Sequence, residues 1–202
     1  MNCYNLAMSE LWMQYHWIAI FDVDEFLVMK SNQFESISEF LSQEKYRNVP
    51  CIAVNWRIFG DSNLTKVDSW SVLSRFTMSD DKLEESSKPI INTGTFKNLV
   101  KMVYNPHSVN AIQVDPNLKF ALKIYGNNPH INDDGNEEPL ELFHYRNKTY
   151  TERFSRCFGK MPVIHHAEVI DSSMSIERFN QDFDRWNTNK IKNTTALDFF
   201  KS

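Results

Sequence analysis

The chain has 202 residues, which is room for one domain of ordinary size, so we expect a single domain over residues 1–202. Hydrophobic residues make up 42% and charged residues 24%, which excludes a wholly disordered chain and supplies enough apolar side chains for a core. The formal net charge of −4 means that the chain lacks the excess of positive charge typical of nucleic-acid-binding proteins, so we expect no nucleic-acid partner. Cysteines occur only at positions 3, 51 and 157, and this odd, widely spaced set fits neither a disulfide scaffold nor a CxxC metal site.

The sequence contains no apolar run of the roughly 18 residues that a transmembrane helix needs. Its first residues also lack the basic segment followed by an apolar stretch that marks a signal peptide. We therefore expect a cytoplasmic protein without a transmembrane segment, and peripheral association with a membrane is left open.

The first part of the chain predicts helices alternating with strands. Residues 4–16 carry a broad apolar face without Gly or Pro, as in a helix. Residues 17–21 form a short apolar run with a β-branched bias, which is typical of a buried strand in a parallel sheet. Ser36 and Glu39 have the spacing of a capping box and predict a short helix over residues 36–41.

The middle of the chain predicts a second buried strand and then polar segments. This strand covers residues 51–59, between Pro50 and Gly60. Residues 71–76 suit either a helix or a strand. The charged stretch over residues 79–89 predicts a mobile loop.

The remaining elements are short strands followed by helices. Helices are expected over residues 151–160 and in a tail over about residues 175–202, where apolar residues recur three and four positions apart. Together the elements predict an α/β fold with a mostly parallel sheet and helices on both faces. The further strands are expected at residues 96–104, 119–125 and 140–145.

Acidic residues follow the first predicted strand directly, at Asp22, Asp24 and Glu25. Because side chains alternate along an extended chain, Asp22 and Asp24 can point the same way. Acids crowded there repel one another, and a hard divalent cation such as Mn²⁺ or Mg²⁺ would neutralise them while diphosphate oxygens complete its shell. The carboxyl ends of parallel strands are also where open α/β sheets bind ligands. The alternative is a solvated acidic turn, because the DxD pattern is common.

A second candidate site begins with His144 and Tyr145, at the end of another short predicted strand. A neutral imidazole is a good ligand for Mn²⁺-like metals. Basic side chains that follow suit phosphate oxygens. The alternative is a surface histidine beside a solvated basic helix face. The basic residues are Arg146, Lys148, Arg153 and Arg156.

Aromatic residues and a glycine end the second buried strand. Trp56, Phe59 and Gly60 suit a sugar ring, since an aromatic face can stack on it and glycine permits close approach. Packing of either aromatic ring in the core is the alternative. Lys97 and His107 flank the next predicted strand, where Lys97 would pair with a phosphate or else lie in solvent.

The order of these motifs resembles glycosyltransferase family 92, formerly domain of unknown function 23, and related family-2-like glycosyltransferases of the GT-A type. The resemblance covers about residues 4–160. No single motif is decisive, whereas all of them in the family's order are fairly specific. In chain order they are YNLAMSELWMQYHWIAIFDVDEFLV, VNWRIFG, Arg75-Phe76, the stretch from Lys97 to His107, and HYRNKTYTERFSR.

The resemblance implies a partial GT-A-like (Rossmann-like) fold and metal-dependent transfer of a sugar from a UDP- or GDP-linked donor to a glycan acceptor. It further implies a hexosyltransferase that inverts the anomeric carbon. By position, Asp22, Asp24 and His144 would hold the metal and the donor diphosphate. The implied substrate contacts are Glu25, Trp56, Phe59, Gly60, Lys97, His107, Tyr145 and Lys148.

The general base stays open. In this chemistry a carboxylate deprotonates the acceptor hydroxyl. Asp61 is a candidate because it follows Gly60, and Asp133 and Asp134 lie in the loop before His144.

Members of the family carry a nucleotide-binding half before the first motif, whereas Met1 lies only about 20 residues before the DxD pattern. We therefore expect a truncated transferase whose first strand lies at or near an exposed sheet edge. If a missing N-terminal part carries a membrane anchor, we expect the protein in the Golgi lumen and not in the cytoplasm. The rival function is a non-catalytic remnant that binds a glycan or a partner. A metal-dependent phosphohydrolase would need more acids and histidines near Asp22 than the sequence offers.

Overall fold

The computed structural model describes residues 3–30, 32–65, 69, 71–95, 103–120, 138–158 and 175–200. The chain forms two compact units. The expectation of one domain over residues 1–202 stays a prediction. The first unit comprises Met1–Arg57 and Lys82–Phe143, and the second comprises Ile58–Asp81 and His144–Ser202.

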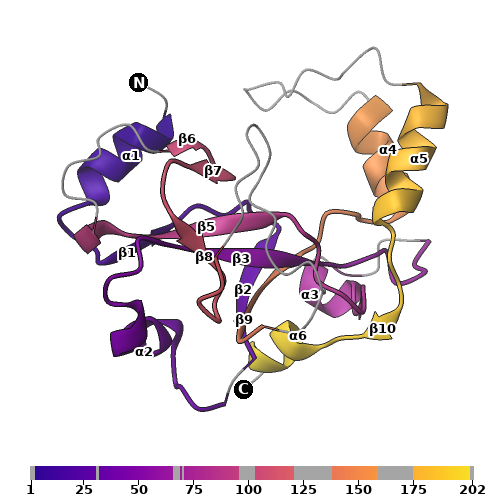
Figure 1. Ribbon diagram of the computed structural model, residues 1–202. Helices are drawn as coiled ribbons and strands as arrows, with labels where there is room; N and C mark the ends of the chain where they lie inside the picture. The colour runs from indigo at the N-terminus through magenta and orange to yellow at the C-terminus, as the bar shows by residue number, and fades with distance from the viewer. Residues whose placement is uncertain are drawn as a thin grey trace. The chain divides into compact units, whose positions relative to one another are not determined.

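A sheet of six described strands forms the centre of the first unit, in the order β1-β5-β3-β9-β2 with β8 paired to β3 (Figure 1). The strands are β1 (Trp17–Ala19), β2 (Glu25–Met29), β3 (Cys51–Ile58), β5 (Ser87–Asn92), β8 (Gln113–Val114) and β9 (Leu140–His144). The other elements are α1 (Cys3–Leu11), α2 (Ile37–Leu41), the 3₁₀ turns η1 (Glu44–Tyr46) and η2 (Thr93–Thr95), and a hairpin of β6 (Val103–Asn105) and β7 (Ser108–Val109).

The sheet is mixed, which corrects the prediction of a mostly parallel sheet. β1 and β3 each pair antiparallel with β5, whereas β3 and β8 are parallel. The apolar run of β3 was misleading because this strand is buried at every position. Burial on both faces makes such a run apolar whatever the direction of the neighbouring strand, so the run does not report strand direction.

β1 is an edge strand of this sheet, as predicted for the first strand. It pairs with β5 through Trp17↔Asn92, Ile18↔Ile91 and Ala19↔Ile90. The strand is less buried than its apolar run predicts, since Trp17 and Ile18 are half-buried and Ala19 is exposed. Among the described strands β1 has one neighbour, β5, and this edge position accounts for its exposure.

α1 and the β6–β7 hairpin pack on the sheet through one apolar cluster. Met8 of α1 lies against Cys51 of β3 and Ile91 of β5. Asn5 ties the helix to the hairpin, because its Nδ2 donates to the Val103 carbonyl at 3.1 Å and its Oδ1 accepts from Val103 N at 3.3 Å. The predicted first helix is therefore anchored by both apolar and polar contacts.

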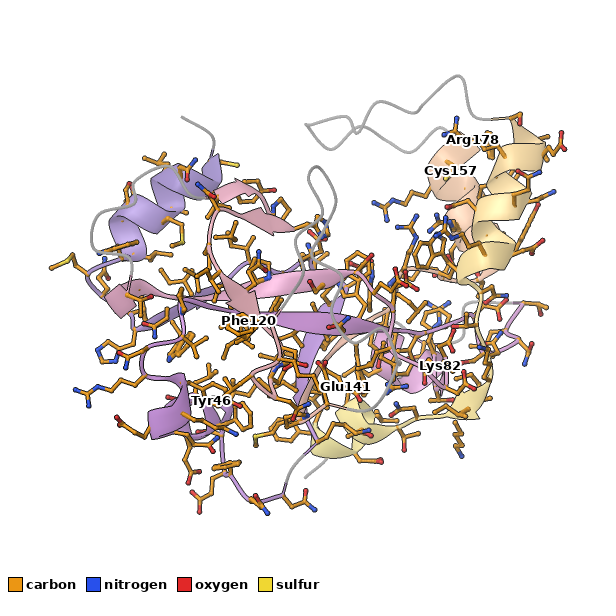
Figure 2. The ribbon with its side chains drawn as sticks, in the orientation of Figure 1. Tyr46, Lys82, Phe120, Glu141, Cys157 and Arg178 are labelled. Atoms are coloured by element: carbon orange, nitrogen blue, oxygen red, sulfur yellow. The ribbon has the colours of Figure 1, made fainter. Side chains whose placement is uncertain are left out.

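The Ser36 cap of the predicted capping box forms at the start of α2, whereas the Glu39 carboxylate bonds one residue before the cap. Ser36 is the N-cap residue, and its hydroxyl accepts a hydrogen bond from Glu39 N at 3.1 Å. The Glu39 carboxylate in turn accepts from Glu35 N at 2.7 Å. Nearby, the hydroxyl of the buried Tyr46, labelled in Figure 2, donates to the Pro116 carbonyl at 2.6 Å.

A buried ion pair joins strands β3 and β9. Arg57 donates from Nε and Nη2 to the two carboxylate oxygens of Glu141 at 2.6 and 2.9 Å. The two side chains are 1% and 0% exposed (Glu141 is labelled in Figure 2). Charges this deep in a protein are tolerated because each compensates the other.

The second unit is mainly helical. Phe154 of α4 lies edge-on to Phe179 of α5 with ring centroids 5.5 Å apart, and Ser175 caps α5 by accepting from Arg178 N at 3.1 Å. The predicted helix over residues 151–160 is found as α4, whereas the predicted helical tail over about 175–202 is interrupted by β10 between α5 and α6. Among the described residues, no helix is both long and apolar enough to cross a membrane. The elements are α3 (Val72–Arg75), β4 (Met78–Ser79), α4 (Tyr150–Phe158), α5 (Ile176–Trp186), β10 (Ile191–Lys192) and α6 (Thr195–Phe199), with β4 and β10 antiparallel.

We expect Arg57→Met to lower the free energy of unfolding by about 3–5 kcal/mol, because it leaves the Glu141 carboxylate buried without its partner. The double variant Arg57→Met/Glu141→Gln removes both charges and should recover most of this loss. Denaturant unfolding followed by tryptophan fluorescence measures all three proteins. A single variant as stable as the wild type would contradict the role given to this pair.

Candidate functional site

The acidic residues predicted after the first strand form a tight turn between β1 and β2. Glu25 N donates to the Asp22 carbonyl at 3.0 Å, and Asp22 N donates to Glu25 Oε2 at 2.8 Å. These reciprocal bonds close the turn. At its tip Val23 is fully exposed and Asp24 is half-buried.

Lys88 of β5 places a positive charge against this turn. The antiparallel pair Ala19↔Ile90 carries the chain beyond β1 alongside the start of β5, so Asp22 reaches Lys88. Lys88 Nζ lies 2.8 Å from Asp22 Oδ2 and 3.4 Å from Glu25 Oε2. We call Asp22, Glu25 and Lys88 the Lys88 cluster.

Burial differs sharply within the Lys88 cluster. The side chains of Lys88 and Glu25 are 0% exposed, whereas that of Asp22 is 56% exposed. Burial raises the pKa of Glu25, while its hydrogen bond from Asp22 N and the Lys88 ammonium oppose the rise. Glu25 Oε1 is buried and finds no hydrogen-bond partner within the described parts of the chain. When all three groups are ionised, two carboxylates and one ammonium leave one net negative charge.

Two more of the predicted site residues lie beside the Lys88 cluster. The rings of Trp56 and His107 meet edge-to-face with centroids 5.4 Å apart. Burial and the Lys88 ammonium lower the pKa of the His107 imidazole, and the Asp22 carboxylate opposes this. Trp56 is only 6% exposed, so its ring supports His107 from within the core. The structure thus brings Asp22, Glu25, Trp56 and His107 together around Lys88.

Lys88 is the residue of this site that sequence reasoning missed. The predicted loop over residues 79–89 includes the start of β5, which begins at Ser87. Pro89 and the neighbouring polar residues obscured the strand, because proline is depleted in sheet interiors. The apolar pair Ile90-Ile91 directly after Pro89 is the signal that could have extended the strand back to Lys88.

The other predicted site residues that the structure describes lie in the second unit, where Gly60 begins a tightly packed turn. A Cβ at Gly60 would lie 2.4 Å from Asn189 Oδ1 and 2.5 Å from the Thr188 carbonyl oxygen. Asp61 is buried, and its Oδ1 accepts from Asn63 N and Asn189 Nδ2, both at 2.8 Å. These bonds order the turn around Asp61, whose role as a general base stays a prediction.

Four further predicted residues gather around the end of β9. The rings of Phe59 and Tyr145 are stacked with centroids 4.4 Å apart, and burial raises the pKa of Tyr145. Phe59 N donates to the His144 carbonyl at 3.0 Å, and Lys148 Nζ donates to the Tyr145 carbonyl at 2.7 Å. Phe59 and Tyr145 are both buried.

The predicted phosphate contact Lys97 and the alternative bases Asp133 and Asp134 lie outside the described residues. The prediction that Asp24 and His144 share one ion involves both units and stays a prediction.

The donor chemistry of the acidic turn fits a hard cation. Within the described ranges no group of three or more His, Cys, Asp or Glu side chains could hold a metal ion. A Mg²⁺-like ion needs no such cage, because one or two carboxylates suffice when substrate phosphates and water complete the shell. Asp22 and Asp24 supply carboxylates of this kind, and Asp22 is more than half exposed.

Comparison with protein families places the chain among the glycosyltransferases. The family model described as Glycosyltransferase family 92 matches residues 4–198, and the chain belongs to this family. The motif order predicted the same family from fewer residues. Family membership supports a transferase with a sugar donor and an acceptor. Neither the curated proteins nor the solved structures yield a match.

We expect Gly60→Ala to lower the free energy of unfolding by about 1–3 kcal/mol, because the added methyl group would overlap the chain at Thr188 and Asn189. Gly94→Ala is the matched control. Its Cβ would meet Asn92 Oδ1 at 3.3 Å, a milder approach than the 2.4 and 2.5 Å at Gly60, so its effect should be smaller. Thermal or denaturant unfolding measures the stability of both variants. Equal losses in the free energy of unfolding would contradict the close packing of the chain against Gly60.

We expect the His107 imidazole to titrate below its ordinary pKa of 6.5, because burial and Lys88 disfavour the charged form. As the pH falls below 6.5 the unfolded chain binds the proton first, so the free energy of unfolding falls until the folded pKa is passed. Lys88→Met should raise the His107 pKa. An NMR titration of the ring signals measures both proteins, and a wild-type pKa at or above 6.5 would refute the expectation.

Proposed function

We propose that this chain is a metal-dependent glycosyltransferase of the GT-A type, which transfers a hexose from a UDP- or GDP-linked donor to a glycan acceptor with inversion. The observation that carries the proposal is the acidic turn with its Lys88 cluster, in a member of glycosyltransferase family 92. The turn is closed by its own hydrogen bonds and leaves Asp22 accessible, as a donor site requires.

Asp22 and Asp24 are the proposed ligands of a Mn²⁺ or Mg²⁺ ion, with His144 as a further contact. A bound ion of this kind neutralises the negative charge that develops on the leaving diphosphate. Asp22 is held through its carbonyl, its amide and its carboxylate, so it needs little reorganisation when the donor arrives. Lys148 is the proposed phosphate contact beyond the turn.

The acceptor side needs a base that removes the proton of the attacking hydroxyl. Asp61 is our candidate. Its carboxylate is oriented by Asn63 and Asn189, which gives it a defined direction within the second unit. Gly60 beside it is a proposed sugar contact and His107 a proposed contact near the donor, whereas the rings of Trp56 and Phe59 are buried and pack in the core.

We expect Asp24→Ala to abolish Mn²⁺-dependent binding of UDP or GDP, because a carboxylate and a diphosphate repel each other unless a cation lies between them. Asp61→Ala should spare this binding and remove turnover. Isothermal titration calorimetry with each nucleotide, with and without Mn²⁺, measures binding, and release of free nucleotide from the donor measures turnover.

The outcomes separate the rival functions. Equal metal-dependent binding by the wild type and Asp24→Ala would remove Asp24 from the site. A folded wild type that shows no metal-dependent heat would contradict the proposed enzyme and favour a non-catalytic module that binds a glycan or a partner.

A further inference from the structure

We infer that Lys88 is a positioning residue of the donor site: its buried ammonium holds the Asp22 carboxylate in the orientation that donor binding requires. The inference rests on the proposed function and deepens it, because Lys88 acts through Asp22 rather than by touching the donor.

The place of Lys88 in the sheet makes it a rigid anchor. β5 lies between β1 and β3, and Lys88 is paired with Val54 of β3. Its side chain is 0% exposed, so the ammonium is satisfied by protein groups rather than by bulk water. The bond of 2.8 Å to Asp22 Oδ2 is charge-assisted, the stronger class of hydrogen bond.

Asp22 is the member of the cluster that can reach a ligand. Its side chain is 56% exposed, whereas Glu25 is shielded together with Lys88. Glu25 Oε2 accepts a hydrogen bond from Asp22 N and also lies 3.4 Å from Lys88 Nζ. The backbone of Asp22 is therefore bound by Glu25, and its side chain by Lys88, and these two partners are buried side by side. Loss of Lys88 would remove this charge-assisted bond from the Asp22 carboxylate. Partners that orient a metal ligand in this way matter nearly as much as the ligand itself.

The competing explanation is purely structural, with Lys88 present solely to compensate the buried charge of Glu25. The two explanations differ when Glu25 is neutral. A structural lysine then has no buried carboxylate to offset, whereas a positioning lysine still holds Asp22. Glu25→Gln is therefore the reference protein, and Lys88→Met/Glu25→Gln is the test.

The experiment measures the free energy of unfolding by denaturant and the dissociation constant of UDP and GDP with Mn²⁺ by calorimetry. We expect the double variant to keep the stability of the reference and to bind nucleotide at least about 10-fold more weakly. Lys88→Gln/Glu25→Gln retains an N–H donor for Asp22 and should recover part of the affinity. Arg57→Met/Glu141→Gln, which neutralises another buried pair of the same unit, is the matched control and should bind like the wild type.

Equal affinity of the reference, Lys88→Met/Glu25→Gln and Lys88→Gln/Glu25→Gln would overturn the positioning role and leave the proposed function intact. The Lys88→Gln variant decides the matter if the Lys88→Met variant does not fold, since a positioning role requires it to bind more weakly than the reference. Absence of metal-dependent binding by the wild type would overturn the proposed function, and this inference with it.

Discussion

The Lys88 ammonium is buried, so the folded chain must supply its counter-charges, and it does so with Asp22 and Glu25. This requirement connects strand pairing to the chemistry of the acidic turn. The pairing of β1 with β5 leads the chain toward Lys88, and the turn then closes on itself through Asp22 and Glu25. One buried charge thus determines where the exposed carboxylate of Asp22 lies.

Local signals in the sequence predicted local structure well. The capping box of Ser36 and Glu39 and the apolar run of β3 both correspond to the elements found, because each depends on neighbours in the chain or on burial alone. The direction of the strands and the presence of strand β5 could not be predicted from such local signals. They depend on partners distant in sequence, and Lys88 in particular looks like a solvated loop residue until β1 and β3 are placed beside it.

The candidate site shows the same division. Asp22 and Glu25 were found from the sequence because crowded acids directly follow an apolar run that predicts a buried strand. The contact between Trp56 and His107 was not foreseen, since it joins β3 to a turn far along the chain. Asp61 was proposed from its place after Gly60, and the structure adds that Asn189 orients it, which no sequence spacing indicates.

Membership of glycosyltransferase family 92 and the acidic turn together give the chain a coherent physical account. The exposed carboxylate of Asp22 is held by the buried Lys88 ammonium, so the proposed metal ligand is presented in a fixed orientation. The turn around Gly60 and Asp61 is the proposed acceptor side.

The most direct test of this account is to locate the ion itself. Paramagnetic Mn²⁺ broadens the NMR signals of nearby nuclei, and Mg²⁺ serves as the diamagnetic control. With UDP or GDP present, the account predicts that Mn²⁺ broadens the amide signals of Asp22, Val23 and Asp24 first, before those elsewhere in the chain. Broadening that begins at other residues, or none at saturating Mn²⁺ and nucleotide, would contradict a metal-bound donor at the acidic turn.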